Sequence, residues 1–156
     1  MRVIVFSDSH GRLDNAFKAL KEAGSLDYLL HAGDLYHDAF TLAAASSLPV
    51  KAVLGNCDKT VEGPAEELFE LGGHRFFITH GHLAGINRLG YLMRKARIYG
   101  AEAVIFGHTH ISQSIMMDGI LLLNPGSISR PRDQERPSYA IIEIGAEGIK
   151  PSIHYL

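Results

Sequence analysis

Residues that could bind metal ions stand at the ends of five apolar segments, each beside a glycine or another residue with a ligand-type side chain. The five groups are Asp8-Ser9-His10, Gly33-Asp34, Gly55-Asn56, His80-Gly81-His82 and Gly107-His108-Thr109-His110. In an open α/β sheet, ligands bind beyond the carboxyl ends of the strands, so strand geometry would gather these side chains at one rim. Carboxylate, amide and imidazole donors without thiolates indicate a hydrolytic metal centre that holds two ions.

The spacing within these groups supports a shared centre. Two pairs are separated by one residue, Asp8 with His10 and His108 with His110. In extended backbone, residues i and i+2 point to the same side, so each pair is expected to reach one centre. Two cations close together need a shared anionic ligand, and Asp34 is the natural bridge.

Glycine precedes three of the candidate ligands and is expected to allow tight bends and a positive φ at the strand ends. These glycines are Gly33, Gly55 and Gly107. Taken separately, the candidate ligands also fit turn aspartates, a capping asparagine and surface histidines. Asp34 would then cap a helix near residue 38, although Asp38 is better placed for that role. Placement at a strand end occurs five times, and this repetition favours the metal centre.

The first third of the chain alternates strands with helices. Apolar, β-branched runs predict strands at 2–7, 27–31 and 50–54. Helical spacing predicts helices at 14–23 and 38–47, the first of them followed by Gly24. This β-α-β-α-β order indicates parallel strands with helical crossovers.

The rest of the chain is richer in hairpins. Glycine-containing turns at 72–73, 118–119 and 145–148 each separate two strand-like runs. A helix at 86–99, which ends before Gly100, and a strand at 103–106 lie between the first and second hairpins. We therefore expect an α/β fold with two mixed sheets packed face to face and helices outside.

Composition predicts one ordinary domain over residues 1–156. Hydrophobic residues make up 46% and charged residues 21% of the chain. The net charge of −2 argues against an extended nucleic-acid surface, and no apolar stretch is long enough to cross a membrane. The single cysteine, Cys57, and the lack of a signal-like segment predict a cytoplasmic location.

In this order, the five groups resemble the calcineurin-like metallophosphoesterase superfamily, and more closely its branch of small single-domain phosphodiesterases. The resemblance covers nearly the whole chain, and Asn124-Pro125-Gly126-Ser127 also resembles that branch. It implies a four-layer α/β/β/α sandwich. It assigns Asp8, His10 and His110 to one ion and Asn56, His80 and His108 to the other, with Asp34 bridging.

The resemblance also implies an enzyme, a metal-dependent phosphodiesterase acting on small or exposed phosphodiesters. The expected reaction is in-line attack on phosphorus by a hydroxide that bridges the two metal ions. Manganese is the ion expected from the resemblance. The oxygen and nitrogen donors are also compatible with Ni²⁺, Fe, Co²⁺ or Zn²⁺.

One departure from the family concerns the proton donor. Many members have a histidine after the asparagine, where this chain has Cys57 followed by Asp58. A thiol with a pKa of about 8.5 is a poor substitute for that histidine. We therefore expect diesters to be cleaved faster than simple monoesters, with the catalytic proton coming from Cys57 or from His82. His82 has two further interpretations, a contact to phosphate and a support for a ligand.

Several other residues have both a functional and a structural interpretation. His31 is expected in the core, and Tyr36 and His37 either line the site or begin a helix. Residues 124–127 form a turn, whose Gly126 and Ser127 amides are expected near phosphate if the resemblance holds. The three arginines of the next segment either contact substrate or are solvated charges; they are Arg130, Arg132 and Arg136.

Three alternative functions stay open. The fold can serve as a protein-binding scaffold, as in a retromer subunit that resembles the superfamily, but such members replace ligand histidines, whereas all seven positions here hold metal donors. A phosphomonoesterase and a cyclic-nucleotide hydrolase with the same metals are the other two. The apolar residues near the C-terminus either complete a sheet or contact another subunit, so a homo-oligomer is also open.

Overall fold

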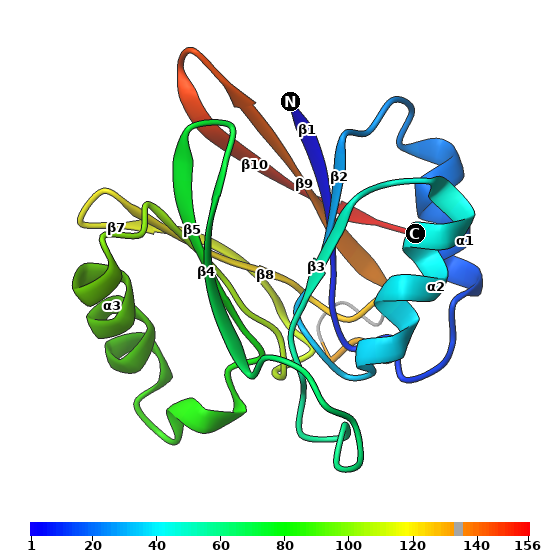
Figure 1. The fold of residues 1–156 in the computed structure, drawn as a ribbon, viewed down its shortest axis with the longest axis horizontal. Coiled ribbons are helices and arrows are strands. Elements are labelled where there is room, and N and C mark those ends of the chain that lie inside the picture. Colours follow the sequence, from blue (N-terminus) through cyan, green and yellow to red (C-terminus); the bar gives the residue numbers. More distant parts are fainter. Residues whose placement is uncertain (133–135) are drawn as a thin grey trace.

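Two five-stranded sheets form the centre of the protein (Figure 1). The computed structural model describes residues 1–132 and 136–156. The first sheet has the order β10 (Gly148–Tyr155), β9 (Ser138–Gly145), β1 (Arg2–Phe6), β2 (Tyr28–His31), β3 (Val50–Ala52). The second has the order β4 (Glu66–Leu71), β5 (His74–Thr79), β6 (Ala103–Ile105), β8 (Ile120–Pro125), β7 (Ser112–Met117).

Both sheets are mixed. The central strands β1, β2 and β3 run parallel in the first sheet, and β5, β6 and β8 run parallel in the second. The hairpin partners β9, β10, β4 and β7 are antiparallel to their neighbours. The parallel strands of each sheet therefore end at the same edge, which is where the candidate ligands follow them.

Alternating side chains of the central strands fill the space on both sides of each sheet. Val3 and Val5 pack between the sheets, whereas Ile4 and Phe6 face the helices α1 (Asp14–Glu22) and α2 (Tyr36–Ser46). On the other side of the molecule, α3 (Arg88–Tyr99) covers the second sheet through a separate apolar cluster. Figure 1 shows the resulting order of helices, sheet, sheet and helix, which confirms the predicted four-layer sandwich.

The helix starts differ from the predicted positions. The second helix begins at Tyr36 instead of residue 38, because the Asp58 carboxylate accepts the Tyr36 N–H at 2.8 Å from a distant loop. Asp38 therefore lies inside the first turn and does not cap the helix. The third helix begins at Arg88, where the Asn87 side chain accepts the Gly90 N–H, and a short 3-10 helix, η1 (His82–Ala84), precedes it. No sequence pattern predicted η1.

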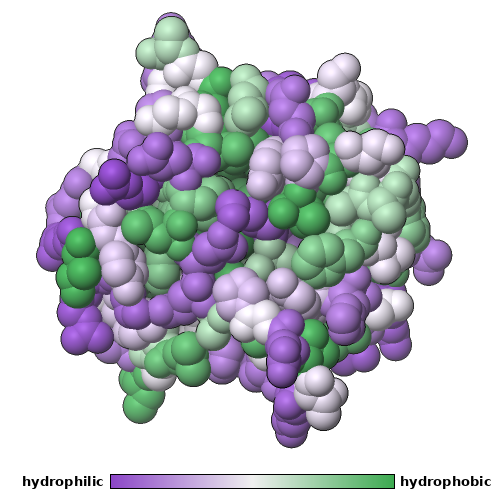
Figure 2. Space-filling model, in the orientation of Figure 1, coloured by the Kyte–Doolittle hydropathy of each residue, from purple (hydrophilic) through white to green (hydrophobic). Residues whose placement is uncertain are grey.

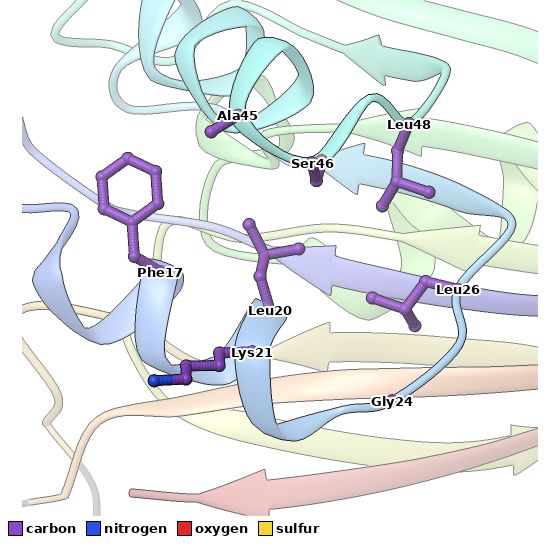
Figure 3. Close-up of a pocket in the computed structure, with 8 residues that line it drawn as sticks. All are labelled: Phe17, Leu20, Lys21, Gly24, Leu26, Ala45, Ser46 and Leu48. Atoms are coloured by element: carbon purple, nitrogen blue, oxygen red, sulfur yellow. The ribbon is translucent and has the colours of Figure 1, made fainter.

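The surface of the protein mixes polar and apolar residues (Figure 2). A groove of about 340 Å³ lies between α1 and the end of α2, lined mainly by apolar side chains such as Phe17, Leu20 and Leu48 (Figure 3). Its lining contains no carboxylate or imidazole, so it does not offer the chemistry of the candidate ligands. Within residues 1–132 and 136–156, no helix has both the length and the apolarity needed to cross a membrane.

Candidate metal centre

The ends of both sheets contribute to one cleft of about 490 Å³. Five candidate ligands line it, together with Cys57 and the segment 130–132. These ligands are His10 and Asp34 after β1 and β2, Asn56 after β3, and His108 and His110 after β6. Asp8 and His80 lie beneath the cleft, and both are fully buried. The seven side chains predicted to bind metal ions are therefore gathered at one rim.

Asp8 is the most deeply buried carboxylate of the group. Its Oδ2 accepts hydrogen bonds from the Ser7 hydroxyl at 2.6 Å and from the His108 N–H at 3.1 Å. Its Oδ1 is buried and has no hydrogen-bond partner among the residues that the structure describes, although it lies 3.2 Å from His110 Nε2 and 3.9 Å from His80 Nε2. A buried carboxylate oxygen without a donor is unusual, and a cation is one group that would satisfy it.

Two histidines direct their Nε2 atoms at this oxygen. The Nδ1 atoms of His80 and His110 each lie 2.6 Å from a carbonyl oxygen, that of Ala32 and that of Arg130. A carbonyl only accepts, so each Nδ1 carries a proton, and Nε2 is the atom that each ring turns towards Asp8. Metal-binding histidines are commonly oriented in this way by a backbone carbonyl. The donor set and its orientation therefore fit a metal ion.

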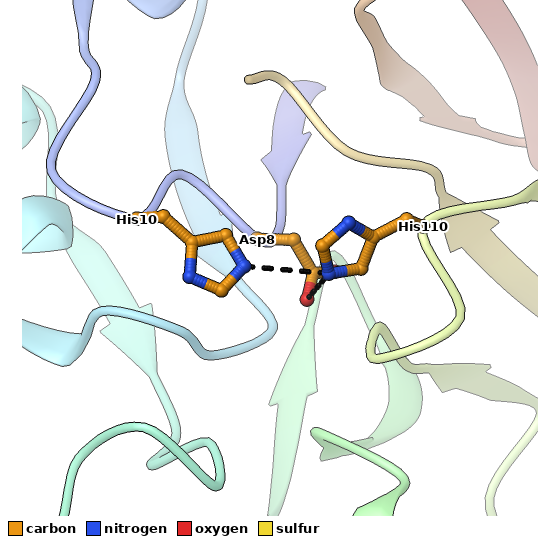
Figure 4. Close-up of side chains that lie close together, drawn as sticks. All are labelled: Asp8, His10 and His110. Carbon is orange, nitrogen blue, oxygen red and sulfur yellow. Dashed lines mark hydrogen bonds and ion pairs between the residues drawn. The ribbon is translucent and has the colours of Figure 1, made fainter. Parts of the chain in front are cut away.

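His10 completes a cluster with Asp8 and His110 (Figure 4). The Nε2 atoms of His10 and His110 lie 3.3 Å apart, and one ligand atom from each of the three residues lies within 4.8 Å of the others. Two facing imidazole nitrogens repel each other unless a proton or a cation lies between them. These three residues are the set that the family resemblance assigns to the first ion.

Asp34 lies between this cluster and the second set of ligands. Its Oδ2 is 4.0 Å from His10 Nε2 and 3.5 Å from His80 Nε2, while its Oδ1 accepts the Cys57 N–H at 2.9 Å. Burial alone would raise the pKa of Asp34, but hydrogen bonds with His80 and Cys57 lower it. An ionised carboxylate that reaches both sets has the position required of a bridging ligand.

The second set is less compact than the first. His80 Nε2 lies 3.2 Å from Asn56 Oδ1, and the ring of His108 lies with its centre 5.2 Å from that of His80. Asp8, Asp34 and His80 also form a close group, so Asp8 adjoins both sets and not only the one assigned by the resemblance. Burial, followed by the charges of His80 and Arg88, lowers the pKa of His108.

The ligand backbones do not have the extended conformation predicted from the sequence. Asp8, His10, Asp34, His108 and His110 all have φ between 48° and 70°, in the left-handed region. That region is unfavourable for residues with a side chain and is concentrated at functional sites. The prediction that residues i and i+2 share one side of a strand was therefore wrong, although both pairs do meet at the site.

The three glycines have two different roles. Gly33 has the expected positive φ of 94°, but Gly55 and Gly107 are not in the left-handed region. A Cβ on Gly55 would lie 1.9 Å from Asp34 Oδ1, and a Cβ on Gly107 would lie 1.9 Å from the Ser7 hydroxyl oxygen. For these two glycines the prediction of positive φ was wrong, and the requirement is space for a carboxylate or its partner.

Polar residues of the 124–129 segment, part of which the resemblance links to the site, hold the ligand loops in place. Ser127 and Ser129 hydroxyls donate to the Asp8 carbonyl oxygen at 2.8 and 2.9 Å. The Asn124 amide donates to the Gly107 carbonyl oxygen at 2.9 Å. The Gly126 N–H donates to Asn124 Oδ1, so the expectation that this amide meets phosphate was wrong. The 124–129 segment supports ligands instead.

A second support lies behind His10. The Asp38 carboxylate accepts the Ser9 hydroxyl at 2.6 Å and the Gly11 N–H at 2.8 Å, and so fixes the residues on both sides of His10. His31 is fully buried and its Nε2 lies 3.1 Å from the same hydroxyl, in agreement with a core position. Burial lowers the pKa of His31 to about 4.

The two candidate proton donors have different surroundings. Cys57 is exposed, not buried as expected for a small apolar residue, and it lines the cleft. Partial burial and the nearby Asp34 raise its pKa to about 11. His82 begins η1, with its ring 5.4 Å from that of His80, and its buried Nδ1 has no hydrogen-bond partner. His82 and the pair Tyr36 and His37 are absent from the cleft lining.

The predicted basic cluster separates into two parts. Arg130 and Arg132 line the cleft, and the backbone at these residues is tied to His110 by hydrogen bonds at 2.6 and 2.9 Å. Arg136 donates instead to the Leu156 carbonyl oxygen at 3.2 Å. Two of the three arginines are therefore placed to meet an anion in the cleft.

Comparisons with known proteins agree with this arrangement. The family model for the calcineurin-like phosphoesterase superfamily domain matches residues 1–147. The probable metallophosphoesterase YsnB of Bacillus subtilis is 35% identical over 147 residues, covering 92% of this chain and 85% of YsnB. The phosphodiesterase YfcE of Escherichia coli K12 is 28% identical over 169 residues, covering 92% of this chain and 88% of YfcE.

Solved structures share the fold. A Streptococcus pneumoniae protein described as a predicted phosphoesterase superposes with a TM-score of 0.80 at 33% identity, covering 99% of this chain and 88% of that one. A Vps29 variant from Entamoeba histolytica also gives a TM-score of 0.80, at 22% identity, covering 100% of this chain and 99% of its own. At that identity the second likeness concerns the fold alone.

Proposed function

Since this chain belongs to the calcineurin-like phosphoesterase superfamily, we propose that it is a phosphodiesterase that uses two divalent metal ions to hydrolyse small or exposed phosphodiesters. The observation that supports this most directly is the buried Asp8 Oδ1, which has no hydrogen-bond donor and is faced by the Nε2 atoms of two oriented histidines. The phosphodiesterase name of YfcE supports the reaction class.

The residues of the cleft have two proposed roles, metal binding and substrate binding. Asp8, His10 and His110 would hold one ion and Asn56, His80 and His108 the other, with Asp34 between them. When bound, such ions lower the pKa of water towards neutrality and offset negative charge on the phosphoryl oxygens. Oxygen and nitrogen donors suit Mn²⁺, Fe, Co²⁺, Ni²⁺ and Zn²⁺, and we propose Mn²⁺.

The scaffold alternative is less well supported by the site. A protein-binding member of the fold has no need for imidazoles that backbone carbonyls orient towards a buried carboxylate, and His80 and His110 are such groups. All seven positions also carry side chains that can bind a metal ion. These two observations favour hydrolysis.

A substrate comparison tests the proposal. Protein stripped of metal and reloaded with Mn²⁺, Ni²⁺, Zn²⁺ or Mg²⁺ is expected to hydrolyse bis(p-nitrophenyl) phosphate faster than p-nitrophenyl phosphate. Both probes release the same nitrophenolate, so their ratio reports the preference for a diester over a monoester. Because Asn56 is followed by Cys57 and not by a histidine that could protonate a departing alcohol, alkyl monophosphates are expected to react more slowly still. The measurement is kcat/KM for each metal and substrate, read as released nitrophenolate.

Two results would contradict the proposal. The absence of hydrolysis with every metal, while metal analysis shows two bound ions, would favour the scaffold. Faster turnover of phosphoserine or alkyl monophosphates than of diesters under the same metal would favour a phosphomonoesterase.

A second prediction concerns the arginines of the cleft. Replacing both Arg130 and Arg132 by alanine is expected to raise KM for the diester by about 25-fold while metal content stays unchanged. Each lost charge removes an interaction with the phosphoryl oxygens, worth about a factor of five at a partly exposed site. Arg136→Ala, which removes the bond to Leu156, is the matched control. An unchanged KM in the double variant would show that the two arginines do not contact substrate.

A further inference from the structure

A second pocket, of about 400 Å³, borders the metal cleft across a single residue. We call it the α3 pocket; its lining includes Ile86, Arg88, Leu89, Phe106, Thr109 and Ile111. In the Gly107–His110 segment the side chains alternate between the two spaces. His108 and His110 line the cleft, whereas Thr109 lines the α3 pocket. The pocket and the cleft therefore share the 108–110 segment as a common wall.

Thr109 forms a fixed boundary between the two spaces. Its hydroxyl oxygen accepts hydrogen bonds from the Asn124 amide at 3.0 Å and from the Ile111 N–H at 3.1 Å. The same hydroxyl lies 3.2 Å from the Ile111 carbonyl oxygen, to which it donates. Because these partners come from two elements, the relative position of cleft and pocket is held by the fold.

The walls of the α3 pocket expose apolar side chains. Leu89 is 37% exposed, Ile111 is 47% exposed and Ile86 is fully exposed. Ile86 and Leu89 follow η1, where the chain enters α3 at the lower left of Figure 1. Apolar side chains grouped at the edge of a polar cleft are typical of a surface that contacts the less polar part of a ligand.

One cation lies among these apolar groups. Arg88 lines the pocket, and its Nε is buried without a hydrogen-bond partner. A buried guanidinium N–H that lacks an acceptor is costly, and an anionic group is the partner that guanidinium binds best. Arg88 therefore brings a positive charge, with one unsatisfied N–H, to the wall of the pocket.

We propose that the α3 pocket binds the ester group that the substrate retains after hydrolysis, and that it prefers an aromatic group carrying an anionic substituent. The apolar walls contact the ring and Arg88 pairs with the anion. This inference rests on the proposed phosphodiesterase function. It makes the enzyme selective among diesters through residues that do not belong to the metal centre.

Three diesters that share p-nitrophenolate as the leaving group test the proposal. Their retained groups are methyl, phenyl and 4-carboxyphenyl, so the chemistry at phosphorus stays closely similar while the contact with the pocket changes. We expect kcat/KM to rise about tenfold from methyl to phenyl, as for an apolar group that gains a pocket. A further rise of about fivefold is expected for 4-carboxyphenyl, as for one ion pair at a partly exposed site.

Two variants test the cation and the apolar wall of the α3 pocket separately. Arg88→Ala is expected to remove only the preference for 4-carboxyphenyl over phenyl, whereas Leu89→Ala is expected to reduce the preference of both aryl diesters over methyl. The matched controls are Arg94→Ala, another arginine of α3 outside this pocket, and Leu68→Ala, an exposed leucine of β4. Both controls are expected to keep the wild-type preferences.

Binding without turnover provides an independent measurement. In isotope-filtered NMR, nuclear Overhauser effects from the ring of diphenyl phosphate, whose leaving group is poor, are expected at the methyl groups of Ile86, Leu89 and Ile111. Equal kcat/KM for the three diesters, or ring contacts only with residues outside the α3 pocket, would overturn the inference while leaving the phosphodiesterase function in place. No hydrolysis of any of the three would instead count against the proposed function itself.

Discussion

The Asp34→Asn variant is expected to lose diester hydrolysis by more than about 100-fold and to retain fewer than two tightly bound ions. Changes to groups that only orient metal ligands already cost about 10- to 100-fold, and Asp34 is proposed to bind both ions directly. Its Oδ2 lies between His10 Nε2 at 4.0 Å and His80 Nε2 at 3.5 Å. An amide has the same shape but lacks the charge that offsets the repulsion between two cations.

The amide substitution is chosen because it preserves the local hydrogen bonding. The oxygen of the new side-chain amide would still accept the Cys57 N–H that Asp34 Oδ1 accepts at 2.9 Å. The variant is therefore expected to melt near the wild-type temperature in the presence of a chelator, which shows that lost activity does not reflect unfolding. Metal content is measured by inductively coupled plasma mass spectrometry. A variant with two bound ions and near-normal turnover would remove Asp34 from the proposed bridge.

The positions of the central strands along the chain, and of the ligands that follow them, could be predicted from the sequence for a simple reason. Central parallel strands are buried on both faces, as Val3 and Ile4 of β1 show, so they appear as short apolar runs whose ends are easy to locate. The residues that follow such runs lie at one edge of the sheet whatever the details of the loops. Asp8 and Asp34 could be placed at that edge for this reason alone.

The conformation of the loops was not accessible in the same way. The left-handed φ of Asp8 and His110 is maintained by contacts from distant segments, such as the Ser127 hydroxyl on the Asp8 carbonyl oxygen. The start of α2 likewise depends on Asp58, which lies beyond the next strand. The residues next to Asp8, His110 and Tyr36 in the sequence give no indication of these distant partners. The residue types alone therefore predicted an extended backbone at the ligands and a later start of the helix.

Gly107 is a further residue whose role differs between the sequence prediction and the structure. Its replacement is expected to have a large effect on activity. Sequence patterns suggest a flexible backbone at Gly107, whereas the structure leaves no space for a Cβ at this position. The Gly107→Ala variant is expected to lose about 100-fold in kcat/KM for the diester, because small displacements of a reacting group have effects of that order. The new Cβ would lie 1.9 Å from the Ser7 hydroxyl oxygen and 2.9 Å from Asp8 Oδ2.

The clash acts on the metal centre through one hydrogen bond. The Ser7 hydroxyl donates to Asp8 Oδ2 at 2.6 Å, so any shift of Ser7 releases one oxygen of the carboxylate and turns the other away from His110. If space is the cause, adding Ser7→Gly to Gly107→Ala relieves the contact at 1.9 Å and recovers activity up to the level of Ser7→Gly alone, which also lacks the hydrogen bond to Asp8. A double-mutant cycle then gives a favourable coupling between the two changes.

Gly145→Ala is the control that isolates this steric effect. A Cβ added at Gly145 would have no atom within 4 Å, and Gly145 is not in the left-handed region, so alanine there is expected to leave activity unchanged and to keep or slightly raise the melting temperature. If Gly107→Ala retained full activity, or if Ser7→Gly gave no recovery while metal content stayed low, the steric account would fail. In the second case, backbone freedom at Gly107 would be the property that the site requires.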